Sequence, residues 1–161
     1  EVLLPWGDEA ERSRADLISQ STGATVLPKL SLSGLATQLA SVSGVIAVDT
    51  GLGHLAAALA RPTLSLYGPT DPGLSGTYGV SQKHLCSTFA CAPCLKKTCA
   101  YKGPAVLDND KTVAPPCFST HPPASVWQTF EALLAEAALG RPKSYYDTSG
   151  YDNSNNGSTG K

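Results

Sequence analysis

The stretch from Gly44 to Pro72 constrains the fold of this chain more than any other, because strand-like and helix-like sequence alternate within it. Residues 45–48, VIAV, are a brief apolar run rich in β-branched residues, which predicts a buried strand. A turn with two glycines follows, then helix-forming sequence over 54–60 and a second apolar run over 63–67. This order predicts a βαβ unit, in which the N–H groups that begin the helix favour an anion such as phosphate.

The residues before this stretch continue the alternation. Short apolar runs at 2–4 and 24–27 predict two more strands. A helix is expected after each of them. The first should begin at Asp8, with Glu11 in its first turn, and end at Gly23, and the second should begin after Ser31 or Ser33. Their expected apolar faces are Ala15, Leu17 and Ile18 in the first helix and Leu32, Leu35 and Leu39 in the second. Strands and helices that alternate through short connections are typical of α/β proteins. We therefore predict a Rossmann-like parallel sheet with helices on both faces.

The second half of the chain reads differently. Residues 83–123 contain five cysteines, several prolines and no sustained helical or strand-like hydrophobic periodicity, so we expect a long irregular segment there. Helical spacing returns over 125–139, with Ser125 as the expected N-cap. Residues 141–161 are rich in Ser, Asn, Gly and Tyr, which predicts a disordered or artificially appended tail. The expected folded domain therefore spans residues 1–140.

Composition excludes several classes of function. The 161 residues are 42% hydrophobic and 16% charged, and the formal net charge is −1 with Lys and Arg scattered along the chain, so no nucleic-acid partner is expected. The sequence has no apolar run of about 18 residues that would span a bilayer and no signal-peptide pattern at its start. We expect a soluble protein.

The glycine-bearing turn offers groups that suit a nucleotide diphosphate. The backbone N–H groups of residues 51–53, Gly51-Leu52-Gly53, can approach phosphate oxygens, because glycine has no Cβ in the way. Thr50 adds a hydroxyl donor, and His54 can donate to a phosphate oxygen. Asp49 would repel a phosphate, so it is expected to hold the turn or to meet a hydroxyl group. The alternative is an ordinary Asx-type turn followed by a solvated histidine.

The motifs DTGLGHLAAAL and RPTLSLYGPTDPGLSGTYG resemble the donor-binding region of the lipopolysaccharide heptosyltransferases of glycosyltransferase family nine. The resemblance extends upstream through LLPWGDEAERSRA and VLPKLSLSGLATQLA and covers roughly residues 2–80. It implies the nucleotide-sugar half of a GT-B enzyme, which takes ADP-heptose as donor and needs no cofactor. It also implies a lipid-linked Kdo acceptor, a cytoplasmic location and a peripheral contact with the inner membrane.

The resemblance also assigns residues. It implies that Thr50 and Gly51 contact the diphosphate with His54 nearby, that Glu11 holds the ribose hydroxyls, and that Leu30 lines the adenine. A one-residue alignment slip would move the ribose role to Glu9. The loop that carries Thr70 and Asp71 ends the second strand of the βαβ unit and is marked as a cleft loop, although a purely structural turn capped by Asp71 is an equal alternative.

No catalytic residue is assigned, because the resemblance places the catalytic base in an N-terminal half. The chain opens at Glu1, without Met and inside an expected strand, so we expect a fragment without the first strand of this domain and without the N-terminal domain. The alternatives are a non-catalytic nucleotide-binding domain and a family-nine glycosyltransferase that uses another nucleotide sugar.

Four cysteines have the spacing C-x4-C-x2-C-x4-C, and a fifth follows, at Cys86, Cys91, Cys94, Cys99 and Cys117. Thiolates at such spacing bind zinc or iron–sulfur clusters in some proteins, whereas an odd count argues against a complete disulfide framework. Metal binding, disulfides and plain thiols all stay open, and the expectation is plain thiols with no metal essential for folding.

Overall fold

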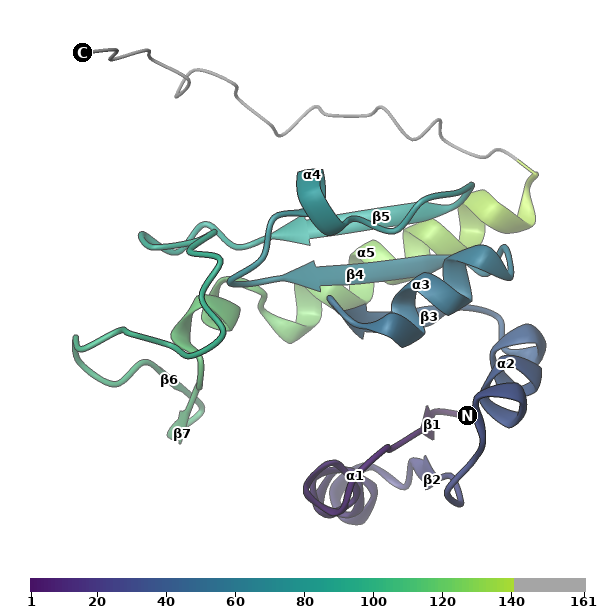
Figure 1. Ribbon diagram of the computed structural model, residues 1–161, viewed down its shortest axis with the longest axis horizontal. Coiled ribbons are helices and arrows are strands. Elements are labelled where there is room, and N and C mark those ends of the chain that lie inside the picture. The colour runs from purple at the N-terminus through teal and green to yellow at the C-terminus, as the bar shows by residue number, and fades with distance from the viewer. Residues whose placement is uncertain (141–161) are drawn as a thin grey trace. The chain divides into compact units, whose positions relative to one another are not determined.

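The computed structural model describes residues 1–140, so the tail predicted for 141–161 lies outside the described residues. The chain divides into two compact units, unit 1 over residues 1–43 and unit 2 from Gly44 onward. Strands and helices alternate along the chain from β1 to β5 (Figure 1), and these strands pair in parallel, which confirms the α/β class. The four expected strands do not share one sheet in this structure, because each unit has a parallel sheet of its own.

Unit 1 consists of four elements: β1 (Leu3–Leu4), α1 (Glu9–Thr22), β2 (Thr25–Val26) and α2 (Leu32–Ser41). The two short strands pair in parallel. The predicted helix signals are confirmed: the Asp8 side chain accepts from the Glu11 N–H, Gly23 ends α1 in the left-handed conformation with φ 73°, and Ser31 caps α2.

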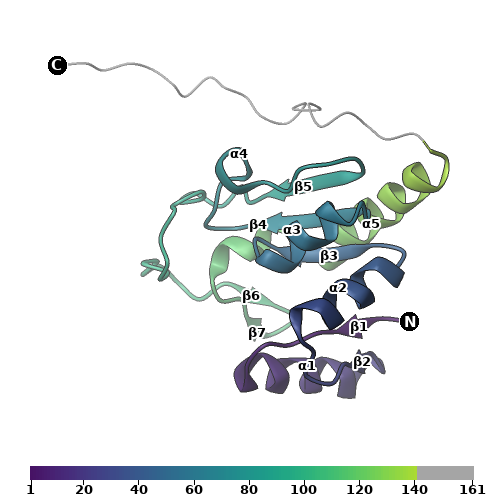
Figure 2. The same ribbon diagram turned by 45° about the vertical axis from the view of Figure 1, so that its right-hand side comes forward.

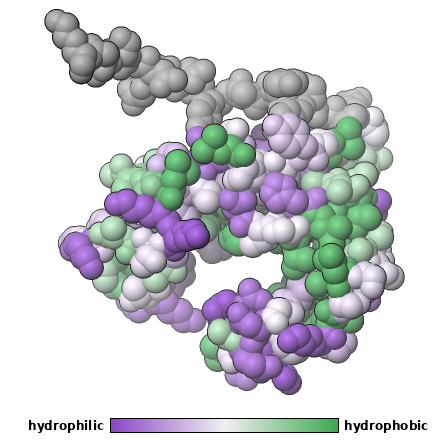
Figure 3. Space-filling model, in the orientation of Figure 1, coloured by the Kyte–Doolittle hydropathy of each residue, from purple (hydrophilic) through white to green (hydrophobic). Residues whose placement is uncertain are grey.

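The predicted apolar faces of these helices are only partly correct. Ala15 is the buried residue of α1, whereas Leu17 is 65% exposed and Leu32, at the start of α2, is 71% exposed. Hydrophilic residues cover α1 and hydrophobic residues gather at the surface of α2 (Figure 3). Strands of two residues offer too little surface to cover a whole helix face.

Unit 2 contains the predicted βαβ unit. Its elements are β3 (Val45–Val48), α3 (Gly51–Ala58), β4 (Thr63–Tyr67), α4 (Pro72–Ser75) and β5 (Gln82–Cys86). The three strands are parallel in the order β3-β4-β5, with Ile46 opposite Leu64 and Leu64 opposite Lys83. The central strand, β4, is almost wholly buried. The parallel arrangement brings the carboxyl ends of all three strands to one edge of the sheet.

Helices cover both faces of this sheet. Leu64 of β4 packs with Val126, Phe130 and Leu133 of α5 (Pro123–Ala138), and these four residues form the main hydrophobic core of the unit. Alternate residues of β4 point to the other face, which α3 covers. Figures 1 and 2 show α3 and α5 on opposite sides of β4.

The region expected to be irregular contains regular elements. Residues 83–86 belong to β5, and a hairpin of β6 (Leu107–Asp108) and β7 (Lys111–Thr112) and a 3-10 helix, η1 (Pro116–Thr120), follow. The prediction missed β5 because an edge strand needs few apolar residues, and its sequence, QKHLC, is mostly polar. The N-cap prediction was also wrong, since α5 begins after Pro122 and not at Ser125.

No helix within residues 1–140 is long and apolar enough to cross a membrane.

Candidate functional site

The junction between β3 and α3 forms the predicted anion turn, with one difference. The helix begins at Gly51, three residues before the expected start at His54, so the two glycines belong to its first turn. The carbonyl oxygen of Thr50 accepts the N–H groups of Gly53 at 3.1 Å and His54 at 3.4 Å. The Thr50 carbonyl oxygen is the first acceptor of the helix, and the N–H groups of Gly51 and Leu52 lie too close to it in sequence to bond with it. These two N–H groups therefore have no acceptor within the helix. Thr50 makes no side-chain capping bond, so its hydroxyl is not committed to the helix.

The two glycines of this turn have different roles. An added Cβ at Gly51 would meet nothing within 4 Å, so the space beside Gly51 is open, and its backbone is not in the left-handed region. The same atom at Gly53 would lie 3.4 Å from the Ala47 Cβ and 3.7 Å from the Val48 carbonyl oxygen. Gly53 is buried and allows α3 to pack closely on β3, and its N–H is already bonded. The Gly53 N–H is therefore less available to a ligand than those of Gly51 and Leu52, and its role in binding stays a prediction.

Asp49 joins the turn to the next loop. Its Oδ2 accepts a hydrogen bond from the Ser75 hydroxyl at 2.8 Å, and its Oδ1 lies 3.9 Å from His54 Nε2. Asp49 thus meets a hydroxyl within the protein, that of Ser75 in α4, and its role in donor binding stays a prediction. Sequence reasoning missed Ser75, because nothing in its neighbourhood marks one serine as a partner for an acid 26 residues away.

A buried polar cluster lies beneath this turn. The Tyr67 hydroxyl donates to the Ser75 carbonyl oxygen at 3.4 Å, and the Tyr67 ring meets the His84 ring edge to face at 5.3 Å. His84 Nε2 and the Thr77 hydroxyl are 2.9 Å apart. Burial raises the pKa of Tyr67, and the charge of Asp49 adds to this effect. Burial also lowers the pKa of His84, which favours the neutral imidazole.

The cleft loop after β4 is held by hydrogen bonds to the Asp71 side chain and from the cysteine-rich segment. The Asp71 Oδ1 accepts the Gly73 N–H at 2.8 Å and caps α4, which begins at Pro72. This is the structural role that the sequence offered as an alternative for Asp71. Thr70 beside it is half-buried. The Leu95 N–H donates to the Pro69 carbonyl oxygen at 2.8 Å and ties the loop to the cysteine-rich segment.

Unit 1 carries the other two predicted binding residues, Glu11 and Leu30. The Glu11 Oε2 accepts the Gly7 N–H at 2.7 Å, so this exposed carboxylate has a capping role at the start of α1. Leu30 lies between β2 and α2 and is half-buried. Sequence reasoning gave no role to Trp6, whose indole N–H donates to the Leu27 carbonyl oxygen at 2.7 Å. The Arg12 guanidinium lies over the Trp6 ring, 5.2 Å from its centroid.

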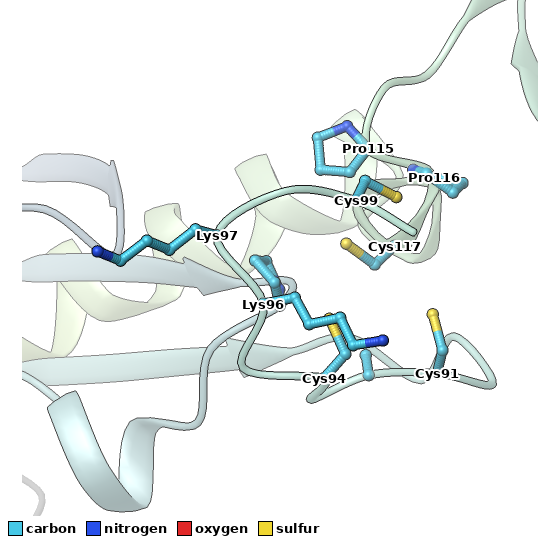
Figure 4. A pocket seen from close by; sticks show the side chains of 10 residues that line it. Cys91, Cys94, Lys96, Lys97, Cys99, Pro115, Pro116 and Cys117 are labelled. Atoms are coloured by element: carbon cyan, nitrogen blue, oxygen red, sulfur yellow. The ribbon is translucent and has the colours of Figure 1, made fainter. Parts of the chain in front are cut away.

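Four of the five cysteines line one cavity in unit 2, shown in Figure 4: Cys91, Cys94, Cys99 and Cys117. Cys86 lies in β5 and is exposed. All five thiols are free, and burial raises the pKa of the Cys117 thiol. Among residues 1–140, no three His, Cys, Asp or Glu side chains are already placed to hold a metal ion.

The fold and this junction define a class: an α/β domain with an open helix N-terminus at the carboxyl edge of a parallel sheet, as in nucleotide-binding domains. Residues 1–104 match the family described as glycosyltransferase family 9 (heptosyltransferase), and the chain belongs to this family.

Individual relatives agree with this assignment. The chain is 54% identical over 138 residues to lipopolysaccharide heptosyltransferase 1 of Pseudomonas aeruginosa, and the match covers 83% of the chain and 39% of that relative. It is 51% identical over 82 residues to the protein of the same name from Escherichia coli K12, a match that covers 50% of the chain and 26% of that relative. The chain thus spans well under half the length of these relatives.

Two solved structures are similar to part of the chain. The E. coli heptosyltransferase WaaC with ADP matches with a TM-score of 0.51 and 49% identity, over 52% of this chain and 27% of that one. The same enzyme with ADP-2-deoxy-2-fluoro heptose matches with a TM-score of 0.50 and 44% identity, over 54% of this chain and 26% of that one.

Proposed function

We propose that this chain binds the nucleotide-sugar donor of a lipopolysaccharide heptosyltransferase, and that the donor is ADP-heptose. The observation that carries the proposal is the open start of α3, where the Gly51 and Leu52 N–H groups have no helical acceptor and nothing fills the space beside Gly51. The similar structures of E. coli WaaC with ADP and with ADP-2-deoxy-2-fluoro heptose support the choice of nucleotide.

The diphosphate belongs at this open turn. Two free N–H groups and the positive end of the helix dipole attract an anion, and such charge-assisted hydrogen bonds are stronger than neutral ones. The hydroxyl of Thr50 supplies a third donor. His54 lies in the same first turn with its side chain 44% exposed, so its ring is accessible to a bound phosphate.

We assign Asp49 to holding the turn and not to the phosphate, because its carboxylate would repel a second anion. The Ser75 hydroxyl and the position of His54 keep this carboxylate at the base of the turn. In unit 1, the proposal assigns Glu11 to the ribose hydroxyls and Leu30 to the adenine. One carboxylate oxygen of Glu11 accepts from Gly7, and the other can accept from a ribose hydroxyl.

The proposed reaction is transfer of heptose from ADP-heptose to the Kdo sugars of the lipopolysaccharide inner core. The family and the names of the relatives support this choice over other nucleotide sugars. A cytoplasmic location with a peripheral contact at the inner membrane belongs to the same proposal, because the Kdo acceptor is carried on a lipid. We assign no catalytic residue within the described chain.

Titration calorimetry with a panel of nucleotides tests this function. ADP and ADP-heptose should bind the 161-residue chain at one site, whereas GDP and UDP at equal concentration should bind at least about tenfold more weakly, a difference of about 1.4 kcal/mol. Equal affinity for all three diphosphates would support an anion turn without donor specificity, and tighter binding of GDP or UDP would refute the ADP assignment.

A further inference from the structure

The cavity lined by Cys91, Cys94, Cys99 and Cys117, here called the four-thiol cavity, is not used by the proposed donor site. Its volume is about 60 Å³. A single water needs only about 10–15 Å³, so the cavity has room for an ion among the four side chains. In Figure 4 these side chains surround one space, although they come from a loop and from η1.

The walls of the cavity are anchored to the sheet at two places. The Leu95 N–H, directly after Cys94, donates to the Pro69 carbonyl oxygen at 2.8 Å. Cys117 is 6% exposed, and its carbonyl oxygen accepts from the Ser87 hydroxyl at the end of β5, also at 2.8 Å. Thiols from two distant parts of the sequence are therefore brought together by the fold itself.

The chemistry of the lining is selective. Besides the four cysteines, the cavity is lined by three prolines, one alanine and two lysines, with no carboxylate and no imidazole. Thiolates alone favour soft or borderline metal ions such as Zn²⁺ over Mg²⁺ or Ca²⁺. The C-x2-C spacing of Cys91 and Cys94 is common among zinc ligands.

Charge also fits a divalent ion. Four thiolates with one Zn²⁺ carry a net charge of −2, so a positive group nearby would stabilise them. Lys96 and Lys97 line the cavity, and Figure 4 shows the Lys96 amine between Cys94 and Cys91 in that view. The odd cysteine count is explained too, because Cys86 lies outside the group in β5.

We propose that Cys91, Cys94, Cys99 and Cys117 bind one Zn²⁺ as a structural site. Binding releases the four thiol protons to solvent and forms four Zn–S bonds of about 2.3 Å. Within residues 1–140 no three His, Cys, Asp or Glu side chains are placed to hold a metal ion, so the proposal requires the four thiols to move closer together on binding. Around Cys91 and Cys94, the Ala92 N–H donates to the Phe89 carbonyl oxygen and the Leu95 N–H to the Pro69 carbonyl oxygen, both at 2.8 Å. This site replaces the expectation of plain thiols.

The site would fix the cleft loop. Pro69 lines the cavity, and an added Cβ at Gly68 would lie 2.9 Å from Cys117 Sγ, so the start of the loop packs directly against the thiol group. A bound ion would therefore order the loop that carries Thr70 and Asp71. Because the four cysteines are separate from the α3 turn, zinc binding can be tested independently of ADP binding.

Elemental analysis of the full chain purified with added Zn²⁺ and without chelator tests the proposal. About one zinc per chain is expected, and Cys91→Ser and Cys94→Ser should each bind at least about tenfold more weakly. Cys86→Ser is the matched control, since this exposed cysteine lies outside the cavity, and it should keep the full content. Because Cys117→Ser is buried and can fail to fold, it is not needed for the test.

Cobalt substitution gives a second measurement on the unaltered chain. Co²⁺ bound by four thiolates should give the intense absorption of a tetrahedral thiolate site, and Zn²⁺ should displace it. Zinc well below one per chain, together with four thiols that react freely or that mass spectrometry finds in disulfides, would overturn the proposal. Zinc retained equally by Cys86→Ser and Cys91→Ser would overturn the choice of ligands.

Discussion

Glu11 shows how one residue can satisfy both a structural and a functional interpretation. Its N–H is capped by Asp8 at 2.8 Å, and its own carboxylate caps the Gly7 N–H, so the helix start explains its presence without any ligand. The family resemblance gives the same carboxylate to a ribose. Only binding measurements separate these two roles.

Replacing Glu11 with Ala should weaken ADP binding by about 1.5–3 kcal/mol, because the charged hydrogen bonding of its free carboxylate oxygen to the ribose is lost. Binding of 2′,3′-dideoxy-ADP should hardly change. Calorimetry with both nucleotides measures the difference, and Glu9→Ala is the control for the alternative alignment. Equal losses for the two nucleotides would show that Glu11 acts only as a cap.

His84 predicts how stability depends on pH. Its pKa in the folded protein is lowered from the ordinary 6.5 by burial, so the unfolded chain takes up a proton at a higher pH than the folded chain does. The free energy of unfolding should therefore fall as pH drops from about 7 to about 5. His84→Gln should reduce this slope and leave the slope between about pH 7.5 and 8.5 unchanged, because His84 is neutral in both states there. Urea titrations at each pH provide the measurement, and an identical slope in both proteins would rule His84 out.

At the scale of elements, the start of α3 combines packing and binding in one short turn. Gly53 lies against Ala47 and Val48 of β3, whereas Gly51 faces open space. The sequence alone treats these glycines alike, because both are simply turn glycines in the pattern G-x-G. Their environments in the folded unit separate the two roles.

Valine at each position tests this separation. Gly53→Val should lower the free energy of unfolding by about 1–3 kcal/mol, because the larger side chain overpacks the contact between α3 and β3. Gly51→Val should change stability by less than about 0.5 kcal/mol and weaken ADP binding by roughly 1–3 kcal/mol, because it fills the space of the phosphate. Urea unfolding and calorimetry on both variants measure these effects. Unchanged ADP affinity in Gly51→Val would exclude this turn as the phosphate site.

The sequence predicted β3 and β4 to the residue, because continuous apolar runs are typical of strands buried in parallel sheets. It could not predict β5, whose edge position tolerates Lys83 and His84. It singled out Asp49 and Thr50 as candidate site residues from local pattern alone, and their role in binding stays a prediction. Two features arise from tertiary packing, which sequence spacing does not encode. They are the hydrogen bond between Ser75 and Asp49 and the position of Cys117 beside the other three cysteines of the cavity.

At the scale of the whole molecule, the described chain comprises two compact units. The proposed donor-binding residues Glu11 and Leu30 belong to unit 1, and the α3 turn and the cleft loop belong to unit 2. The match to glycosyltransferase family 9 runs through both units over residues 1–104. The central claim is that this chain binds ADP, and such binding should raise the free energy of unfolding.

The most direct test is unfolding of the 161-residue chain with and without ADP. At ~100 times its Kd, a ligand that binds only the folded state raises the free energy of unfolding by about 2.7 kcal/mol. For a domain of this size, that corresponds to a rise in Tm of about 5–10 °C. The account predicts this rise for ADP and a smaller one for the Gly51→Val variant. No rise in Tm at millimolar ADP would contradict the donor-site assignment.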